Sequence, residues 1–114
     1  MSTSKEIDYV LGTHDAEIGR LHLQHGIWRE LVHDCWKRAG ISAGQRIIDI
    51  GCGPGFASVD LADIVGTDGA VIGIERSERF IDYAKGLSTA RAVENISFLQ
   101  ADVMLDELNV ADAD

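Results

Sequence analysis

Three glycines alternate with other residues near the middle of the chain, directly after an apolar run that contains one acid. The run is residues 47–50, the acid is Asp49, and the glycines are Gly51, Gly53 and Gly55. Glycine adopts backbone conformations closed to other residues and lets a ligand approach the main chain without meeting a Cβ atom. The pattern therefore predicts a buried parallel strand that leads through a tight ligand-binding loop into a helix.

The spacing of the glycines distinguishes between two kinds of ligand. The fingerprint that binds a dinucleotide pyrophosphate needs its third glycine three positions after the second, where this chain has Phe56. A carboxylate at Asp49 would repel a pyrophosphate, but it suits a ligand that carries an ammonium and a sulfonium group. The order acid-x-Gly-x-Gly-x-Gly resembles the first motif of the class I S-adenosylmethionine-dependent methyltransferases.

Two further acids, Glu75 and Asp102, follow the next two predicted strands. Ligands of an open parallel sheet bind outside the carboxyl ends of its strands, so the three acids are expected to meet there. The distance of Glu75 from the glycine loop suits a carboxylate that binds ribose hydroxyls. The resemblance implies that Glu75 binds the ribose and Asp102 the adenine amine, with Arg76 and Val103 beside the ring.

The resemblance also implies S-adenosyl-L-methionine as the cofactor. Asp49 and the backbone near Gly51 would hold its methionine portion. Small-molecule members of the family close an amino-terminal helix over the cofactor, and Arg20 and Gln24 lie one turn apart, where both could reach its carboxylate. The predicted cofactor-binding residues are Arg20, Gln24, Asp49, Gly51, Cys52, Gly53, Gly55, Glu75, Arg76, Asp102 and Val103.

The sequence nominates neither a catalytic residue nor a metal site. No residue is spaced to act as a general base, and Cys52 is interpreted as a small residue that fills the loop. His22, His25 and His33 share one helical segment but lack a further ligand at metal-binding spacing. We expect these histidines to lie on the surface or to pack against another helix.

The elements that position these residues begin with a long helix over residues 13–40. Thr13 can cap its start and Gly40 can close it. Apolar residues at three-and-four spacing predict one buried stripe along it. The stripe comprises Ile18, Leu21, His25, Trp28, Val32, Cys35 and Ala39, with Leu31 and Trp36 on its margins.

The rest of the chain alternates strands and helices. After the strand at 47–50 we expect a helix at 56–65, with Asp60 and Asp63 in solvent, and then a strand at 70–75. A helix capped by Ser77 follows and ends near residue 92, and the last strand is expected at 96–100. This order predicts the first half of a Rossmann-like, doubly wound α/β sheet, with its strands in the spatial order three, two, one.

The predicted organisation is an amino-terminal helical segment, residues 1–40, and a cofactor-binding half-domain, residues 41–114. Four more strands follow in the family that the motifs resemble, so we expect a truncated domain that lacks the acceptor site and is inactive alone. The first strand would then lie at a sheet edge although it is apolar on both faces. Self-association through that edge is therefore an expected property.

Composition limits the remaining possibilities. The 114 residues carry a formal charge of −9, which disfavours nucleic acid as a partner. No apolar run approaches the length of a membrane span or a signal peptide core, so a cytoplasmic location is expected.

The favoured function is methyl transfer to a small molecule. The alternatives are a nicotinamide-dependent oxidoreductase half-domain and a non-catalytic binding or assembly module.

Overall fold

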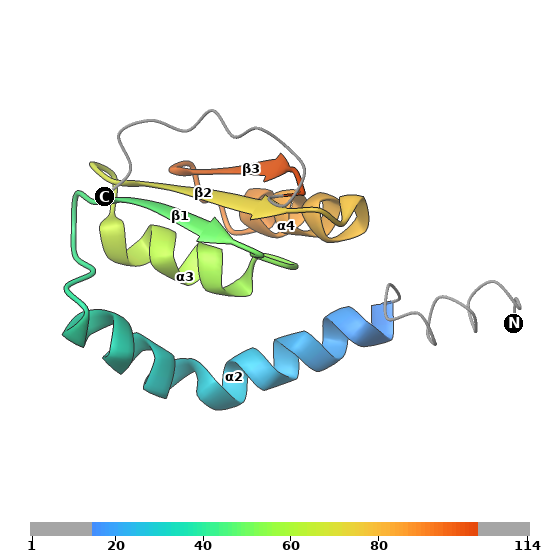
Figure 1. Ribbon diagram of the computed structural model, residues 1–114, viewed down its shortest axis with the longest axis horizontal. Coiled ribbons are helices and arrows are strands. Elements are labelled where there is room, and N and C mark those ends of the chain that lie inside the picture. Colours follow the sequence, from blue (N-terminus) through green and yellow to red (C-terminus); the bar gives the residue numbers. More distant parts are fainter. Residues whose placement is uncertain (1–14, 103–114) are drawn as a thin grey trace, which may run out of the picture.

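The computed structural model describes residues 15–102, so the predicted cap Thr13 and the predicted ring contact Val103 lie outside the described part. Three parallel strands form one sheet, and α2 and α3 lie on the same side of it (Figure 1). The elements in order are α2 (Asp15–Arg38), β1 (Arg46–Ile50), α3 (Phe56–Val65), β2 (Ala70–Glu75), α4 (Glu78–Ala90) and β3 (Ile96–Gln100).

The sheet has the order β1-β2-β3, with β2 in the centre, as the right-handed crossovers predicted. Its register aligns Ile47 with Val71 and Val71 with Ile96. All three strands point in the same direction, so their carboxyl ends share one edge of the sheet (Figure 1). The Rossmann-like half-domain predicted from the sequence is confirmed.

A cluster of core residues lies between this sheet and α3, and Ile81 and Ala84 of α4 are also buried. Leu61, Ala62 and Val65 of α3 pack with Val71 of β2, and all four are almost fully buried. Burial of a side chain as large as valine or leucine contributes about 1.5–3 kcal/mol. The partly buried side chains around this cluster are Trp36, Ile41, Ile47, Val93 and Ile96.

The end of α2 and the start of α4 lie where the sequence predicted them. Gly40 adopts a left-handed conformation (φ +89°) just after α2, where Ile41 N–H donates to Trp36 O at 3.0 Å. This arrangement ends the helix as the glycine predicted. At the start of α4, the Ser77 hydroxyl accepts a hydrogen bond from Phe80 N–H at 3.3 Å, which confirms Ser77 as a cap.

β1 lies at an edge of the described sheet, with β2 as its only neighbour among the described strands. Ile50, at the carboxyl end of β1, leaves 59% of its surface exposed. An apolar strand with unpaired backbone groups on one side is open to pairing with another chain. The structure therefore retains the exposed edge that the sequence predicted.

The predicted buried stripe of α2 was partly wrong. Ile18 is buried, but Trp28 and Cys35 are exposed. Asp60 of α3, predicted to lie in solvent, is buried against α2. The reason is that polar side chains, in addition to apolar ones, set the rotation of α2 about its axis, and helical periodicity does not report such a contact.

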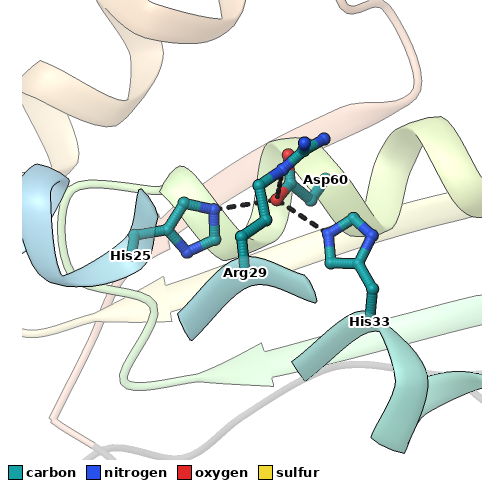
Figure 2. A network of polar contacts seen from close by, with 4 residues as sticks. All are labelled: His25, Arg29, His33 and Asp60. Atoms are coloured by element: carbon teal, nitrogen blue, oxygen red, sulfur yellow. Dashed lines mark hydrogen bonds and ion pairs between the residues drawn. The ribbon is translucent and has the colours of Figure 1, made fainter. Parts of the chain in front are cut away.

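That contact joins three donors on α2 to one carboxylate oxygen on α3 (Figure 2). His25 Nε2, Arg29 Nε and His33 Nε2 lie 2.8, 3.0 and 2.9 Å from Asp60 Oδ2. Burial raises the pKa of Asp60, but the hydrogen bonds from His33, Arg29 and His25 outweigh it and leave that pKa below its ordinary value. We call these four residues the Asp60 cluster. It confirms that two of the three histidines pack against another helix.

Removal of the shared acceptor is expected to loosen α2. Asp60→Ala leaves three donors without their partner, which should lower the free energy of unfolding by about 1–3 kcal/mol. Urea unfolding measures this, with Asp63→Ala, an exposed aspartate on the same helix, as the matched control. Equal stability of the two variants would show that the cluster does not hold α2 in place.

Candidate functional site

The glycine loop borders open space at two of its three glycines. Gly51, Gly53 and Gly55 all have positive φ, at +71°, +57° and +90°. A Cβ atom built at Gly51 or Gly53 meets nothing within 4 Å, whereas at Gly55 it would lie 2.9 Å from Ala84 Cβ. The first two glycines therefore leave room for a ligand against the backbone, and the third permits close packing of α4 against the loop.

Asp49 lies half-buried at the start of this loop and faces α3. Its Oδ2 accepts a hydrogen bond of 2.6 Å from the Ser58 hydroxyl. Burial raises the pKa of Asp49 above its ordinary value, and the hydrogen bond from Ser58 offsets only part of that rise. A carboxylate that is costly to ionise in the ligand-free chain is well placed to bind a cation.

Glu75 connects the glycine loop to the turn that follows β2. Gly53 N–H donates to its Oε1 at 3.1 Å, and Ser77 N–H donates to its Oε2 at 2.9 Å. Each oxygen keeps a further lone pair, since a carboxylate has about four acceptor sites. Glu75 therefore shapes the loop and can still accept hydrogen bonds from a ligand.

A cavity of about 690 Å³ adjoins Glu75 at the carboxyl ends of β2 and β3. Three of the residues that line it, Glu75, Arg76 and Asp102, were predicted from the sequence to share a site. Sequence reasoning did not nominate the other four, Ser77, Phe80, Gln100 and Ala101. The available signal for Phe80 was its place in the first turn of the helix that follows the acid of β2.

A second cavity, of about 800 Å³, lies between Arg29, α3 and the segment before β3. None of the residues predicted for the site lines this cavity. It mixes acids such as Asp63 and Glu94 with Arg29 and Arg91, so its walls favour neither sign of charge. The smaller cavity, which Glu75 connects to the glycine loop through its hydrogen bond from Gly53, is therefore the candidate site.

Cys52 is buried inside the glycine loop. Burial, together with the charges of Asp49 and Glu75, raises the pKa of its thiol to about 12. The thiol is therefore protonated at neutral pH and is a poor nucleophile. Any contribution of Cys52 to ligand binding comes from its backbone.

The structure does not bring Arg20 and Gln24 to either cavity. The Arg20 guanidinium pairs with Glu17 on the same helix and its side chain is 66% exposed. Gln24 is also exposed. A contact between these residues and a cofactor stays a prediction.

The amino-terminal half of α2 nevertheless approaches the glycine loop through an aromatic contact. The His22 ring stacks on the ring of Phe56, the first residue of α3, with centroids 4.6 Å apart. Tyr83 of α4 meets the same ring edge-on at 5.8 Å. Sequence reasoning noted Phe56 only as the residue that breaks the dinucleotide fingerprint, and missed that it joins α2 to α4.

Two negative findings apply within residues 15–102. These residues contain no group of three or more histidine, cysteine, aspartate or glutamate side chains arranged to hold a metal ion. Of the helices formed there, none combines the length and the apolar character that a bilayer crossing requires.

A glycine turn and three acids at the carboxyl ends of parallel strands define the ligand-binding half of a Rossmann-like domain. Residues 41–113 match the family described as methyltransferase domain, and the chain belongs to that family.

The chain is 40% identical over 81 residues to a demethylmenaquinone methyltransferase of Lactococcus lactis subsp. lactis (strain IL1403), a match that covers 71% of this chain and 31% of the relative. It is 32% identical over 81 residues to the demethylmenaquinone methyltransferase of Staphylococcus aureus (strain MRSA252), again over 71% of this chain and 32% of the relative. The chain thus spans about a third of the length of these curated relatives.

Solved structures of methyltransferases share the fold. A SAM dependent methyltransferase from Aquifex aeolicus superposes with a TM-score of 0.59 at 27% identity, over 61% of this chain and 37% of that one. Coclaurine N-methyltransferase, solved with N-methylheliamine and SAH, gives a TM-score of 0.64 at 25% identity, over 69% of this chain and 23% of that one.

The two kinds of loop glycine are expected to respond differently to alanine. Gly55→Ala combines a strained backbone with a clash against Ala84, and should cost about 2–4 kcal/mol of stability. Gly53→Ala adds only the backbone strain, about 1–2 kcal/mol, because its Cβ enters open space. Urea unfolding of both variants tests this, and a greater loss in Gly53→Ala would contradict the packing described for the loop.

Proposed function

We propose that this chain forms the S-adenosyl-L-methionine-binding half of a methyltransferase that acts on a small organic molecule. The observation that carries the proposal is a cavity lined by Glu75 and Asp102, together with a glycine loop that donates to Glu75 from Gly53 and whose first two glycines border open space. Membership of the methyltransferase domain family supports it.

The donor set fits the cofactor group by group. Asp49 is the carboxylate proposed to meet the ammonium of the methionine portion. Glu75 has lone pairs left for the ribose hydroxyls, and Asp102 supplies an acceptor for the adenine amine. Arg76 and Phe80, in the same cavity, provide flat surfaces beside the ring. Val103 completes the predicted set and lies outside the described residues.

S-adenosyl-L-methionine supplies a methyl group that is already activated for in-line displacement. The work left to the protein is to hold the cofactor and the acceptor in attack geometry. On this chain, Glu75 fixes the shape of the glycine loop, and Asp49 supplies negative charge at the start of that loop. We propose that the acceptor pocket and any general base are formed by residues other than 15–102.

The first acceptor to test is demethylmenaquinone, because the relatives of this chain carry that compound in their names.

We further propose a division between a helical segment, residues 1–40, and a cofactor-binding segment, residues 41–114. The start of the family match at residue 41 supports this division. The charge of −9 supports the proposal that nucleic acid is not a partner, and a cytoplasmic location stays a proposal.

A nicotinamide cofactor fits the loop poorly. Phe56 occupies the position at which a dinucleotide-binding loop needs glycine, and it is almost fully buried between the rings of His22 and Tyr83. A pyrophosphate would also lie beside the carboxylate of Asp49. The oxidoreductase alternative is therefore disfavoured.

Asp49→Asn should weaken the binding of S-adenosyl-L-methionine without lowering the stability of the fold. The raised pKa means that the ligand-free fold disfavours the charged carboxylate, so the variant should be as stable as the parent or more stable at pH 7. The parent should gain stability relative to the variant as the pH falls through that raised pKa. S-adenosyl-L-methionine should bind the variant more weakly. Urea unfolding between pH 4 and pH 7 and titration calorimetry at pH 7 measure the two effects. Lower stability with unchanged affinity would show that Asp49 serves the fold alone.

Glu75→Ala should weaken the binding of S-adenosyl-L-methionine roughly 10- to 100-fold, because hydrogen bonds to a charged acceptor contribute about 1.5–3 kcal/mol. Titration calorimetry measures the affinity, with Glu78→Ala, an exposed glutamate at the start of α4, as the control. Circular dichroism without ligand checks that the loop change has not unfolded the chain. An unchanged affinity in the folded variant would contradict the ribose assignment.

A further inference from the structure

α2 carries a strip of large apolar side chains on the side away from α3. Leu23, Ile27, Trp28 and Leu31 each leave 53–68% of their surface exposed. Leu23, Ile27 and Leu31 are four residues apart and therefore lie along one helix face. Each is followed two residues later by a member of the Asp60 cluster, about half a turn away. The strip thus faces away from the contact that fixes α2 to α3.

Charged side chains flank this strip in a symmetric pattern. Ile27 lies at the middle of α2, and Leu23 and Leu31 are equally distant from it on either side. Arg20 and Asp34 are also equally distant from Ile27, and they carry opposite charges. Each already has a partner on its own helix, Glu17 for Arg20 and Arg38 for Asp34, so an acid–base pair lies near each end of the strip.

We propose that α2 pairs with α2 of a second copy of this chain, antiparallel, about a two-fold axis beside Ile27. In that arrangement Ile27 meets its own copy, and Leu23 meets the second Leu31. Arg20 of each copy meets Asp34 of the other, because both lie the same distance from the axis. The contact buries the same patch on both copies, as a two-fold interface does.

The charges select the antiparallel direction. A parallel pair would place Arg20 against Arg20 and Asp34 against Asp34, which brings like charges together at both ends. The antiparallel pair makes two Arg20–Asp34 contacts and extends the acid–base pairs already present on each helix into networks of four charges. It also opposes the two helix dipoles. Since this face lines neither cavity, pairing leaves the candidate site open.

The first test measures molar mass by sedimentation equilibrium on the chain as it stands. The parent should be a dimer, and Ile27→Glu should be a monomer because it places two carboxylates against each other on the axis. Ile50→Glu, at the exposed end of β1, is the control for pairing through the sheet edge and should stay dimeric. A monomeric parent, or a dimer lost only in Ile50→Glu, would overturn the proposal.

The second test exchanges the two charges and does not depend on an apolar substitution. Arg20→Glu alone and Asp34→Arg alone should each raise the dissociation constant roughly tenfold, because two contacts per dimer become repulsive. The double variant Arg20→Glu with Asp34→Arg restores opposite charges across the axis. Its dissociation constant should return to within about threefold of the parent value.

The double variant also separates pairing from helix stability. On its own helix it places like charges beside Glu17 and beside Arg38, which disfavours the helix. If the single changes act only by weakening α2, the double variant should dimerise least, and that result would overturn the proposal. Lys85→Glu and Asp82→Arg make the same two charge changes at exposed positions of α4 and should leave the dissociation constant unchanged.

Discussion

One carboxylate determines the relation between the two turns on which the candidate site depends. Glu75 accepts a hydrogen bond from Gly53 in the glycine loop and another from Ser77 at the start of α4. These turns follow different strands. Gly51 N–H and Cys52 N–H also donate to Ile74 O, so Glu75 adds a side-chain connection to the backbone one. The same side chain lines the cavity at the carboxyl ends of β2 and β3. The shape of the loop and the chemistry of the site are thus linked through a single residue.

Asp49, unlike Glu75, carries a negative charge that the ligand-free fold disfavours. Each oxygen of Glu75 accepts a backbone hydrogen bond in the ligand-free structure, whereas Asp49 is half-buried, has a raised pKa and accepts a side-chain hydrogen bond from Ser58. A charge that costs stability in the free protein is often retained for function. Because the ligand proposed here is cationic, the acid that is least favourable for the fold is the one best suited to bind it.

The strands and the loop could be predicted because local signals determine them. The strand at 70–75 and the helix at 56–65 have the predicted bounds, and the first strand begins one residue earlier than expected. The docking of α2 could not be predicted, since it depends on the geometry between two helices. Periodicity placed Trp28 in the core and Asp60 in solvent, and both assignments failed because Asp60 accepts hydrogen bonds from three side chains of α2.

A crystal structure of this chain with S-adenosyl-L-homocysteine tests the central claim most directly. We expect the ribose hydroxyls to donate to Glu75 and the adenine amine to lie against Asp102, with the amino acid portion beside Gly51 and Gly53. A ligand bound in the larger cavity near Arg29 and Asn95, or a glycine loop closed over the space beside Gly53, would contradict it.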